Sequence, residues 1–465
     1  MTIGEVLELA RESDFRLVDV RFIDLMGAWQ HFVMPARQLT ADFFEKGRYF
    51  EGAGPKGWAF PGGAGMRIVP DPATAMADPF ARVKTLSLVG SVHDQAGGGP
   101  LTRDPRTILR RALDAAGRAL DGAKVRVGAE MDFYVFDEVR YDQTRNSAYF
   151  YVDSDEGRIS AAREEGGQQA KSGREPYYTM PDGYFELRHD LLDGLLELGL
   201  AVSIEHREGH GAGQATVYLS PTDPLTQADN IMWVKYAVKN IALRNGKVAT
   251  FMPRPLADES PSGLNLLWTM EKNGADLFPE VPGAAGANAG RSFAGGILKH
   301  SAALCAFTNP TLNSYRRLAP GADSPVNIMV SSVNRSAALA FGVLPDGSAG
   351  ALRLRLPDPA MNPYLGFAAL LSAGVDGLKT ESDPGPDVDK DLSLLSQEEL
   401  ADVPVAPASL EEALAALEVD GAFLYADGVF DEEVAALWVE LKMETEVSSA
   451  RARPTPHEYA LYFDT

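Results

Sequence analysis

The sequence predicts an α+β protein, and three features support this fold class. Residues 15–34, "FRLVDVRFIDLMGAWQHFVM", alternate apolar and polar residues on both sides of "LMGA", which is typical of a β-hairpin. Residues 103–120, "RDPRTILRRALDAAGRAL", begin a helix, because Asp104 is a favourable cap and Pro105 suits the first turn. Further along, strand-like and helix-like runs interleave. This mixture favours an antiparallel or mixed sheet that carries helices.

Taken in order, the hairpin opens a small strand-rich unit that passes through Gly- and Pro-rich loops to about residue 103. We therefore expect an N-terminal domain of residues 1–103 and a larger domain of residues 104–465. Alternating and apolar runs predict strands at Lys124–Phe136, Ala201–His206, Val248–Met252 and Leu264–Met270. Helical periodicity predicts helices at Asp229–Leu243 and Phe293–Phe307, followed by amphipathic helices in "SLEEALAALEVDG" and "DEEVAALWVELKMETEV".

The composition excludes several classes of protein. The 465 residues include 43 basic and 65 acidic side chains, for a net charge of −22, so nucleic acid and anionic membranes are not expected partners. No window approaches a membrane span, and the N-terminus lacks a basic flank with a long apolar core. The single cysteine, Cys305 in "ALCAF", is expected to be buried and excludes an intrachain disulfide. We expect a cytoplasmic protein.

The run "VGAEMDFYVF" places two carboxylates in an apolar strand. Residues two apart on a strand share a face, so Glu130, Asp132 and Tyr134 should point the same way. Two carboxylates roughly 6.6 Å apart suit one shared cation or two neighbouring cations. The alternative is the solvated face of an edge strand, which carries no function.

Two further segments carry candidate groups. In "IEHREGHGAGQATV", His206 and Glu208 lead into glycines that permit close approach to a ligand, although a plain turn fits as well. In "GALRLRLPDP", Arg353 and Arg355 share one strand face while leucines take the other. Paired guanidiniums on a strand can clamp a carboxylate or phosphate, so they point to an anionic substrate, unless they neutralise surface acids.

Several long segments resemble type I glutamine synthetase, in order and over essentially the whole chain. They include "EMDFYVFD", "EHREGHGAGQ", "KVATFMPRP", "GGILKHSAALCAFTNPTLNSYRRLAPGADSPVN", "PDPAMNPYLGFAALLSAGVDGLK" and "RPTPHEYALYFD". The resemblance implies a small N-terminal β-grasp domain and a catalytic domain with a curved antiparallel sheet and surrounding helices. It also implies a homo-oligomer of two stacked hexameric rings, with active sites between subunits. The implied substrates are glutamate or a glutamate-like acid and an amine, and the implied cofactors are ATP and Mg²⁺ or Mn²⁺.

The resemblance implies two cation sites, and this chain departs from both. For the first site, Asp132 stands where a Glu is expected, Glu208 matches a ligand, and Thr216 replaces a Glu. For the second, nucleotide-side site, Glu130 matches a ligand, but Asn265 replaces a His and Arg353 replaces a Glu. Thr and Asn are weak neutral donors and Arg cannot bind a cation, so at most one metal is expected to be retained.

The implied substrate residues are also a mixture of retained and altered positions. Arg317 and Arg355 match the pair that holds the glutamate carboxylate, and Arg335 matches a phosphate-contacting arginine. Glu51 stands where an aspartate helps to deprotonate ammonium, and Asp323 stands where a glutamate closes over the intermediate. The altered positions are Ala340 for a second phosphate arginine, Ser260–Pro261 for an Asn-Gly pair, and Ser393 for a regulatory tyrosine.

These residues leave three functions open. The first is an ATP-dependent ligase that forms a γ-glutamyl amide with an amine other than, or besides, ammonia. The second is a catalytically degenerate paralogue that acts as a scaffold, sensor or partner, and the third is a nucleotide-independent reaction on a glutamate-like acid. We also predict that Arg353 projects toward Glu130 and fills the volume of the missing metal, in which case the fold keeps the shape of the site without its ATP chemistry.

Overall fold

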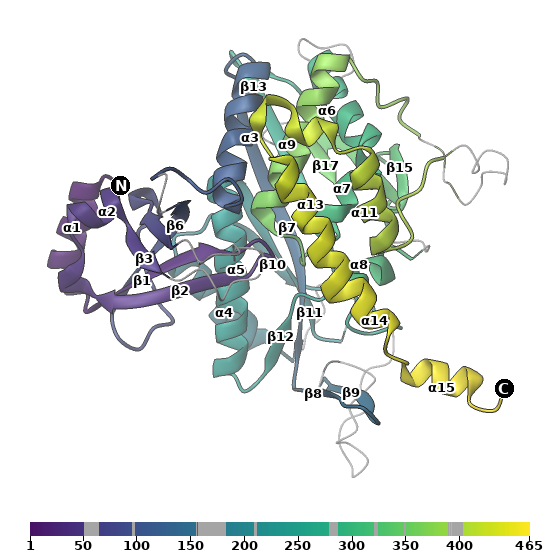
Figure 1. Ribbon diagram of the computed structural model, residues 1–465, viewed down its shortest axis with the longest axis horizontal. Coiled ribbons are helices and arrows are strands. Elements are labelled where there is room, and N and C mark those ends of the chain that lie inside the picture. Colours follow the sequence, from purple (N-terminus) through teal and green to yellow (C-terminus); the bar gives the residue numbers. More distant parts are fainter. Residues whose placement is uncertain are drawn as a thin grey trace.

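The computed structural model describes residues 1–50, 65–94, 98–154, 156, 183–208, 212–278, 287–319, 324–347, 350–388, 390, 392 and 403–465. Figure 1 shows a smaller N-terminal unit beside a larger body in which long helices lie against a sheet. The C-terminal helix α15 (Pro456–Tyr462) extends away from that body. The observed class is α+β, as the sequence predicts.

The N-terminal sheet has the strand order β2-β1-β6-β4-β3, with β5 paired to β6. The predicted hairpin is confirmed, because β1 and β2 pair antiparallel from Leu17 opposite Pro35 to Ile23 opposite Trp29. β1 runs parallel to β6. The elements of this unit are α1 (Ile3–Glu12), β1 (Leu17–Ile23), β2 (Trp29–Pro35), α2 (Ala41–Lys46), β3 (Arg48–Phe50), β4 (Met66–Pro70), β5 (Met76–Ala77) and β6 (Thr85–Asp94).

The larger sheet has the order β10-β11-β7-β13-β17-β16-β15, with β12 paired to β7 and β14 to β13. Along this path β15 and β16 run parallel and the other neighbours run antiparallel, so the sheet is mixed. A separate hairpin joins β8 (Glu138–Gln143) and β9 (Ala148–Asp153). The strands are β7 (Lys124–Phe136), β10 (Val202–Arg207), β11 (Gln214–Thr222), β12 (Val248–Thr250), β13 (Leu264–Lys272), β14 (Ala275–Asp276), β15 (Asn327–Val330), β16 (Ala337–Val343) and β17 (Gly350–Leu354).

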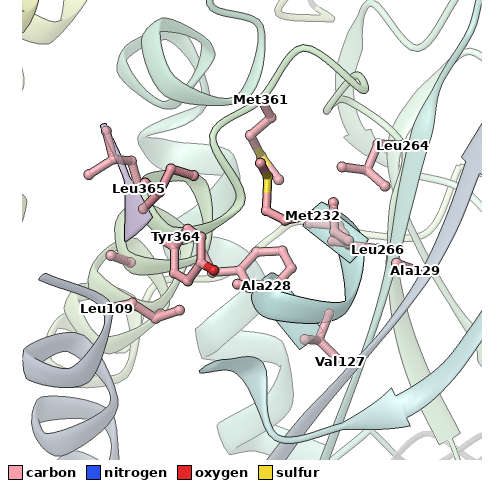
Figure 2. Close-up of a cluster of buried hydrophobic side chains, with 14 of the residues drawn as sticks. Leu109, Val127, Ala129, Ala228, Met232, Leu264, Leu266, Met361, Tyr364 and Leu365 are labelled. Atoms are coloured by element: carbon pink, nitrogen blue, oxygen red, sulfur yellow. The ribbon is translucent and has the colours of Figure 1, made fainter. Parts of the chain in front are cut away.

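One face of this sheet is buried under helices. Figure 2 shows Val127 and Ala129 of β7 and Leu264 and Leu266 of β13 turned toward side chains such as Met232. These residues are almost completely buried, and their strand neighbours in sequence therefore point to the opposite face. The helices of this part are α3 (Pro105–Ala119), α4 (Phe185–Glu197), α5 (Pro224–Arg244), α6 (Ala287–Lys299), α7 (Ser301–Thr308), α8 (Leu312–Arg317), α9 (Pro363–Thr380), α11 (Leu410–Val419), α12 (Ala422–Tyr425), α13 (Glu432–Lys442) and α14 (Ser449–Arg451).

Some helix boundaries differ from the sequence prediction. α3 begins as predicted, since the Asp104 carboxylate accepts a hydrogen bond from the Thr107 N–H at 2.9 Å. The single helix predicted at Phe293–Phe307 is wrong: it is two helices that meet at His300. The His300 ring is held by Asp376 and Asp420 at 2.9 and 2.8 Å, which fixes the break. Among the helices of the described segments, none combines the length and apolar content needed to cross a bilayer.

Candidate active site

The open face of the larger sheet collects polar side chains through strand register. Thr216 lies opposite Asp132 on β11 and β7, and Tyr218 lies opposite Glu130. On the other side of β7, Asn265 of β13 also lies opposite Glu130. Directly opposed residues in an antiparallel pair share a face, so these side chains form one continuous polar strip. The alternation of "VGAEMDFYVF" therefore places both of its carboxylates on the face opposite the helices.

Thr216 links two carboxylates at one end of this strip. Its hydroxyl oxygen lies 2.7 Å from Asp132 Oδ1 and 2.8 Å from Glu208 Oε1. Asp132 Oδ2 accepts a hydrogen bond from the Gly263 N–H at 2.7 Å, and Glu208 Oε1 forms an ion pair with His206 Nε2 at 3.0 Å. The predicted first-site residues are thus brought together, with threonine at their centre.

The proton count of this cluster is set by that threonine. A hydroxyl has one proton to donate, so two short contacts to carboxylates require a second proton on one of the acids. Burial, followed by the charge of Glu208, raises the pKa of Asp132 to about 7. The hydrogen bond to Glu208 raises the pKa of His206 as well. Without a cation, Asp132 therefore keeps a proton below about pH 7.

The donor set fits one hard cation at the first site. Within the described residues, no group of three or more His, Cys, Asp or Glu side chains is arranged to hold a metal ion. Two carboxylates and one hydroxyl nevertheless converge at Asp132, Glu208 and Thr216. Mg²⁺ is commonly held by one or two carboxylates, with water and substrate oxygens completing its shell. These three side chains would hold a bound cation, which would screen negative charge on the reacting groups.

The second site does not fit a cation. The Asn265 side-chain N–H donates to Glu130 Oε1 at 3.0 Å, and Arg353 Nη1 donates to Glu130 Oε2 at 3.3 Å. Both oxygens of Glu130 are therefore occupied, and a guanidinium lies where a cation would have to bind. The predicted projection of Arg353 toward Glu130 is observed in the structure.

Arg317 and Arg355 lie close together but bond to different groups. Arg317 is 4% exposed, and its two Nη atoms donate to the backbone carbonyls of Leu356 and Arg355 at 2.8 and 2.9 Å. Arg317 thereby fixes the backbone that carries Arg355. Arg355 is partly exposed, and its Nη1 contacts three backbone carbonyls, the nearest being Asn334 O at 3.0 Å. The substrate roles of both arginines stay predictions.

The remaining predicted positions fall into two groups. Arg335 is exposed in the turn before β16, and Ala340 is buried on β16 directly opposite Arg353. Glu51, Asp323 and Ser393 lie outside the described residues.

The residues that hold the Ser260–Ser262 segment were not predicted from the sequence. Gln214 is 1% exposed, and its Nε2 donates to Pro261 O and Ser262 Oγ at 3.3 Å. The Tyr134 hydroxyl donates to Ser260 O at 2.6 Å. Gln214 lies opposite Tyr134 and shares its face with Asp132, so this segment is anchored beside the carboxylates. Strand alternation could have indicated this role, because Gln214 precedes Thr216 by two residues and therefore shares its face.

Comparisons with known proteins identify the family of this chain. Residues 14–95 match the family model "Glutamine synthetase, beta-Grasp domain", and residues 102–462 match "Glutamine synthetase, catalytic domain". The glutamine synthetase of Frankia alni is 40% identical over 99% of this chain and 98% of its own. That of Streptomyces filamentosus is 39% identical, with 99% and 98% covered.

Two solved structures extend the comparison to three dimensions. A cryo-EM structure of Plasmodium falciparum glutamine synthetase matches with a TM-score of 0.88 and 24% identity over 99% of both chains, which shows the shared fold. A complex of GmaS with ADP matches with a TM-score of 0.81 and 28% identity, again over 99% of both chains. The chain therefore belongs to the glutamine synthetase family of ATP-dependent glutamate–amine ligases.

Proposed function

We propose that this protein joins the γ-carboxylate of glutamate to an amine other than, or besides, ammonia, with ATP as the energy source. The observation that carries the proposal is the Asp132–Thr216–Glu208 cluster, whose oxygen donors suit one cation and which lies on the same sheet face as Arg353 and Arg355. A complex of GmaS with ADP is a structural neighbour of this chain, and it lends support to the use of an adenine nucleotide. The reaction needs one Mg²⁺ or Mn²⁺ ion per active site.

The reaction proceeds in two balanced steps. A γ-carboxylate oxygen of glutamate attacks the γ-phosphorus of ATP, which forms an acyl phosphate and releases ADP. The amine nitrogen then attacks the acyl carbon, loses a proton, and expels inorganic phosphate as the amide forms. The guanidinium of Arg355, on the backbone that Arg317 fixes, holds the negatively charged substrate during both steps.

The amine is expected to differ because the carboxylates of the site differ. Thr216 removes one negative charge from the centre of the first cluster, and Glu51 replaces a shorter acid at the position for ammonium deprotonation. Because ammonium and an alkylammonium ion carry the same charge, the changed reach of the acid at position 51 is the difference that favours another amine.

A second function has one observation in its favour. Glu130 is occupied by Asn265 and Arg353, which is also the arrangement expected of a catalytically inactive paralogue that senses a ligand. Such a protein would bind glutamate without consuming ATP.

Phosphate release from ATP separates these functions. Purified protein is assayed with glutamate and a panel of ammonium, methylamine, longer alkylamines and polyamines, at several Mg²⁺ and Mn²⁺ concentrations. Release that requires both glutamate and an organic amine supports the proposal. No release with any amine, together with no thermal shift on nucleotide addition, would leave only the inactive paralogue or a nucleotide-independent reaction. Release with ammonium alone would overturn the amine assignment.

Assembly, compartment and domain boundary complete the proposal. We propose two stacked hexameric rings in the cytoplasm, with a boundary between residues 103 and 104. Support for the assembly comes from apolar side chains that one chain leaves exposed, because large exposed apolar surfaces mark interfaces. They lie on the β8–β9 hairpin and on the C-terminal segment: Tyr141, Tyr149, Phe150, Tyr459, Leu461, Tyr462 and Phe463.

A further inference from the structure

We propose that Arg353 binds the β- and γ-phosphate groups of the nucleotide, as a fixed cation at the position where a second divalent metal is implied. The inference rests on the proposed ligase function and names a binding residue that the family comparison does not supply. Its basis is the placement of Arg353 among Glu130, Ala340 and two other arginines.

Arg353 has donors to spare. Its side chain is 32% exposed, and within the described segments its hydrogen bonding is limited to the Nη1 contact with Glu130 at 3.3 Å. A guanidinium has five N–H donors in a planar fork that matches phosphate oxygens. Glu130 therefore orients Arg353 while most of its donors stay available to a ligand. The Asn265 amide holds Glu130 from the other side.

The residue opposite Arg353 on the neighbouring strand is small and uncharged. Ala340 of β16 lies directly opposite Arg353 of β17, so the two residues share a face. The resemblance implies an arginine at position 340 and an acid at position 353. In this chain the two positions are exchanged in charge: the small apolar Ala340 lies on β16 and Arg353 lies on β17. The phosphate-binding charge has moved by one strand and now lies beside Glu130.

The charges around Arg353 favour an anion. Arg355 lies two residues along on the same face, and burial, then Arg353 and then Arg335, lower the pKa of Arg355 to about 10. The guanidiniums of Arg335, Arg353 and Arg355 are therefore close enough to repel one another. In the described part of the chain, one ion pair to a carboxylate is formed among them, that of Arg353 with Glu130. A bound polyphosphate would relieve the remaining repulsion.

The first cation site supplies a second positive charge for the phosphate groups. Glu130 and Asp132 are two residues apart on β7, about 7 Å along the strand. A phosphate chain between a cation at Asp132 and Glu208 and the guanidinium of Arg353 would be neutralised from both sides. AMP has neither the β- nor the γ-phosphate and would gain little from Arg353.

The test is calorimetric titration of the full-length protein at fixed Mg²⁺ with the non-hydrolysable analogue adenylyl imidodiphosphate and, separately, with AMP. Arg353→Ala is expected to weaken the analogue roughly 10- to 100-fold and to change AMP affinity by less than about twofold. Arg353→Lys keeps the charge without the fork and should fall between. Arg118→Ala, on the exposed side of α3, is the control and should match wild type.

Each outcome decides between the two proposals. Unchanged affinity of Arg353→Ala for the analogue, or an equal loss for AMP, overturns the role of Arg353 alone, because wild type still binds nucleotide. Wild-type protein that binds neither nucleotide overturns the ligase function and this inference together.

Discussion

Arg353 crosses an intervening strand to reach Glu130: its Nη1 lies 3.3 Å from Glu130 Oε2, although β13 separates β17 from β7. Asn265 on β13 holds the other oxygen of the same carboxylate at 3.0 Å. The two cation positions implied by the family resemblance are therefore not equivalent in this chain. One keeps two acids around a hydroxyl, whereas the other is closed by a guanidinium and an amide.

Restoring ligands should reopen the closed position. We expect the double variant Arg353→Glu/Asn265→His to bind two Mn²⁺ ions per chain where wild type binds one, because it exchanges a cation and an amide for two ligands beside Glu130. Electron paramagnetic resonance counts bound and free Mn²⁺. The matched single variant Arg353→Met removes the charge without adding an oxygen ligand and should still bind one ion. Two ions in wild type would contradict the closed second site.

Thr216 should limit cation affinity at the first position. Thr216→Glu adds a third carboxylate to Asp132 and Glu208, and we expect Mn²⁺ affinity to rise at least about tenfold, since carboxylate number tunes such sites. Thr216→Val keeps the shape but removes the hydroxyl, so it should bind more weakly than wild type. Calorimetric titration measures both. Weaker binding by Thr216→Glu would show that no cation is held between these acids.

Cation binding should depend on pH through Asp132. In the cation-free protein, burial and the charge of Glu208 raise the pKa of Asp132 to about 7. Below that pH the carboxyl keeps a proton that a cation must displace, so apparent Mn²⁺ affinity should fall by up to about tenfold per pH unit from 7 to 5. Titration in two buffers of unlike ionisation enthalpy measures the released proton. Equal affinity at pH 6 and pH 8 would refute this assignment.

A buried ion pair should stabilise the fold behind the site. Arg106 is 2% exposed and pairs with Asp229 at 2.8 Å and Asp71 at 2.9 Å, and Tyr364 donates to Asp229. Arg106→Ala leaves Asp229 buried without its cation and should cost about 3–5 kcal/mol. Arg110→Ala removes a half-exposed partner of Asp71 and should cost at most about 1 kcal/mol. Unfolding in urea compares them, and equal losses would contradict this ranking.

The exposed C-terminal segment should be required for assembly. Residues 451–465 are exposed throughout, including three aromatic side chains on or next to α15. Deleting residues 452–465 should reduce the particle from two rings to one, because the facing ring would lose the aromatic side chains that pack against it. Mass photometry measures the particle mass. Replacing Thr465 with Ala, which keeps the aromatic residues, should leave it unchanged. A truncated protein that retains the two-ring mass would contradict this role.

The sequence predicts those parts of the fold that local patterns determine. The hairpin at residues 15–34, the start of α3 at Asp104 and the bounds of β7 follow from alternation and capping, and all three are observed. The break at His300 could not be predicted locally, because it depends on Asp376 and Asp420, which are 76 and 120 residues away.

In the candidate active site, too, local sequence patterns predict some features and long-range contacts determine the others. The shared face of Arg353 and Arg355 follows from strand alternation, and Leu352 and Leu354 are buried on the other face as expected. The Glu130 contact required the strand order β7-β13-β17, and the hydrogen bonds of Gln214 required the register of β11 on β7. The sequence alone determines neither of them.

The most direct test of the ligase function follows oxygen from substrate to product. Protein is incubated with ATP, glutamate labelled with oxygen-18 in its γ-carboxylate, and an alkylamine, and the phosphate and amide are analysed by mass spectrometry. An acyl phosphate requires one labelled oxygen in each released phosphate and one γ-glutamyl alkylamide for each ADP. Unlabelled phosphate, or amide formed only with ammonium, would contradict the proposed function.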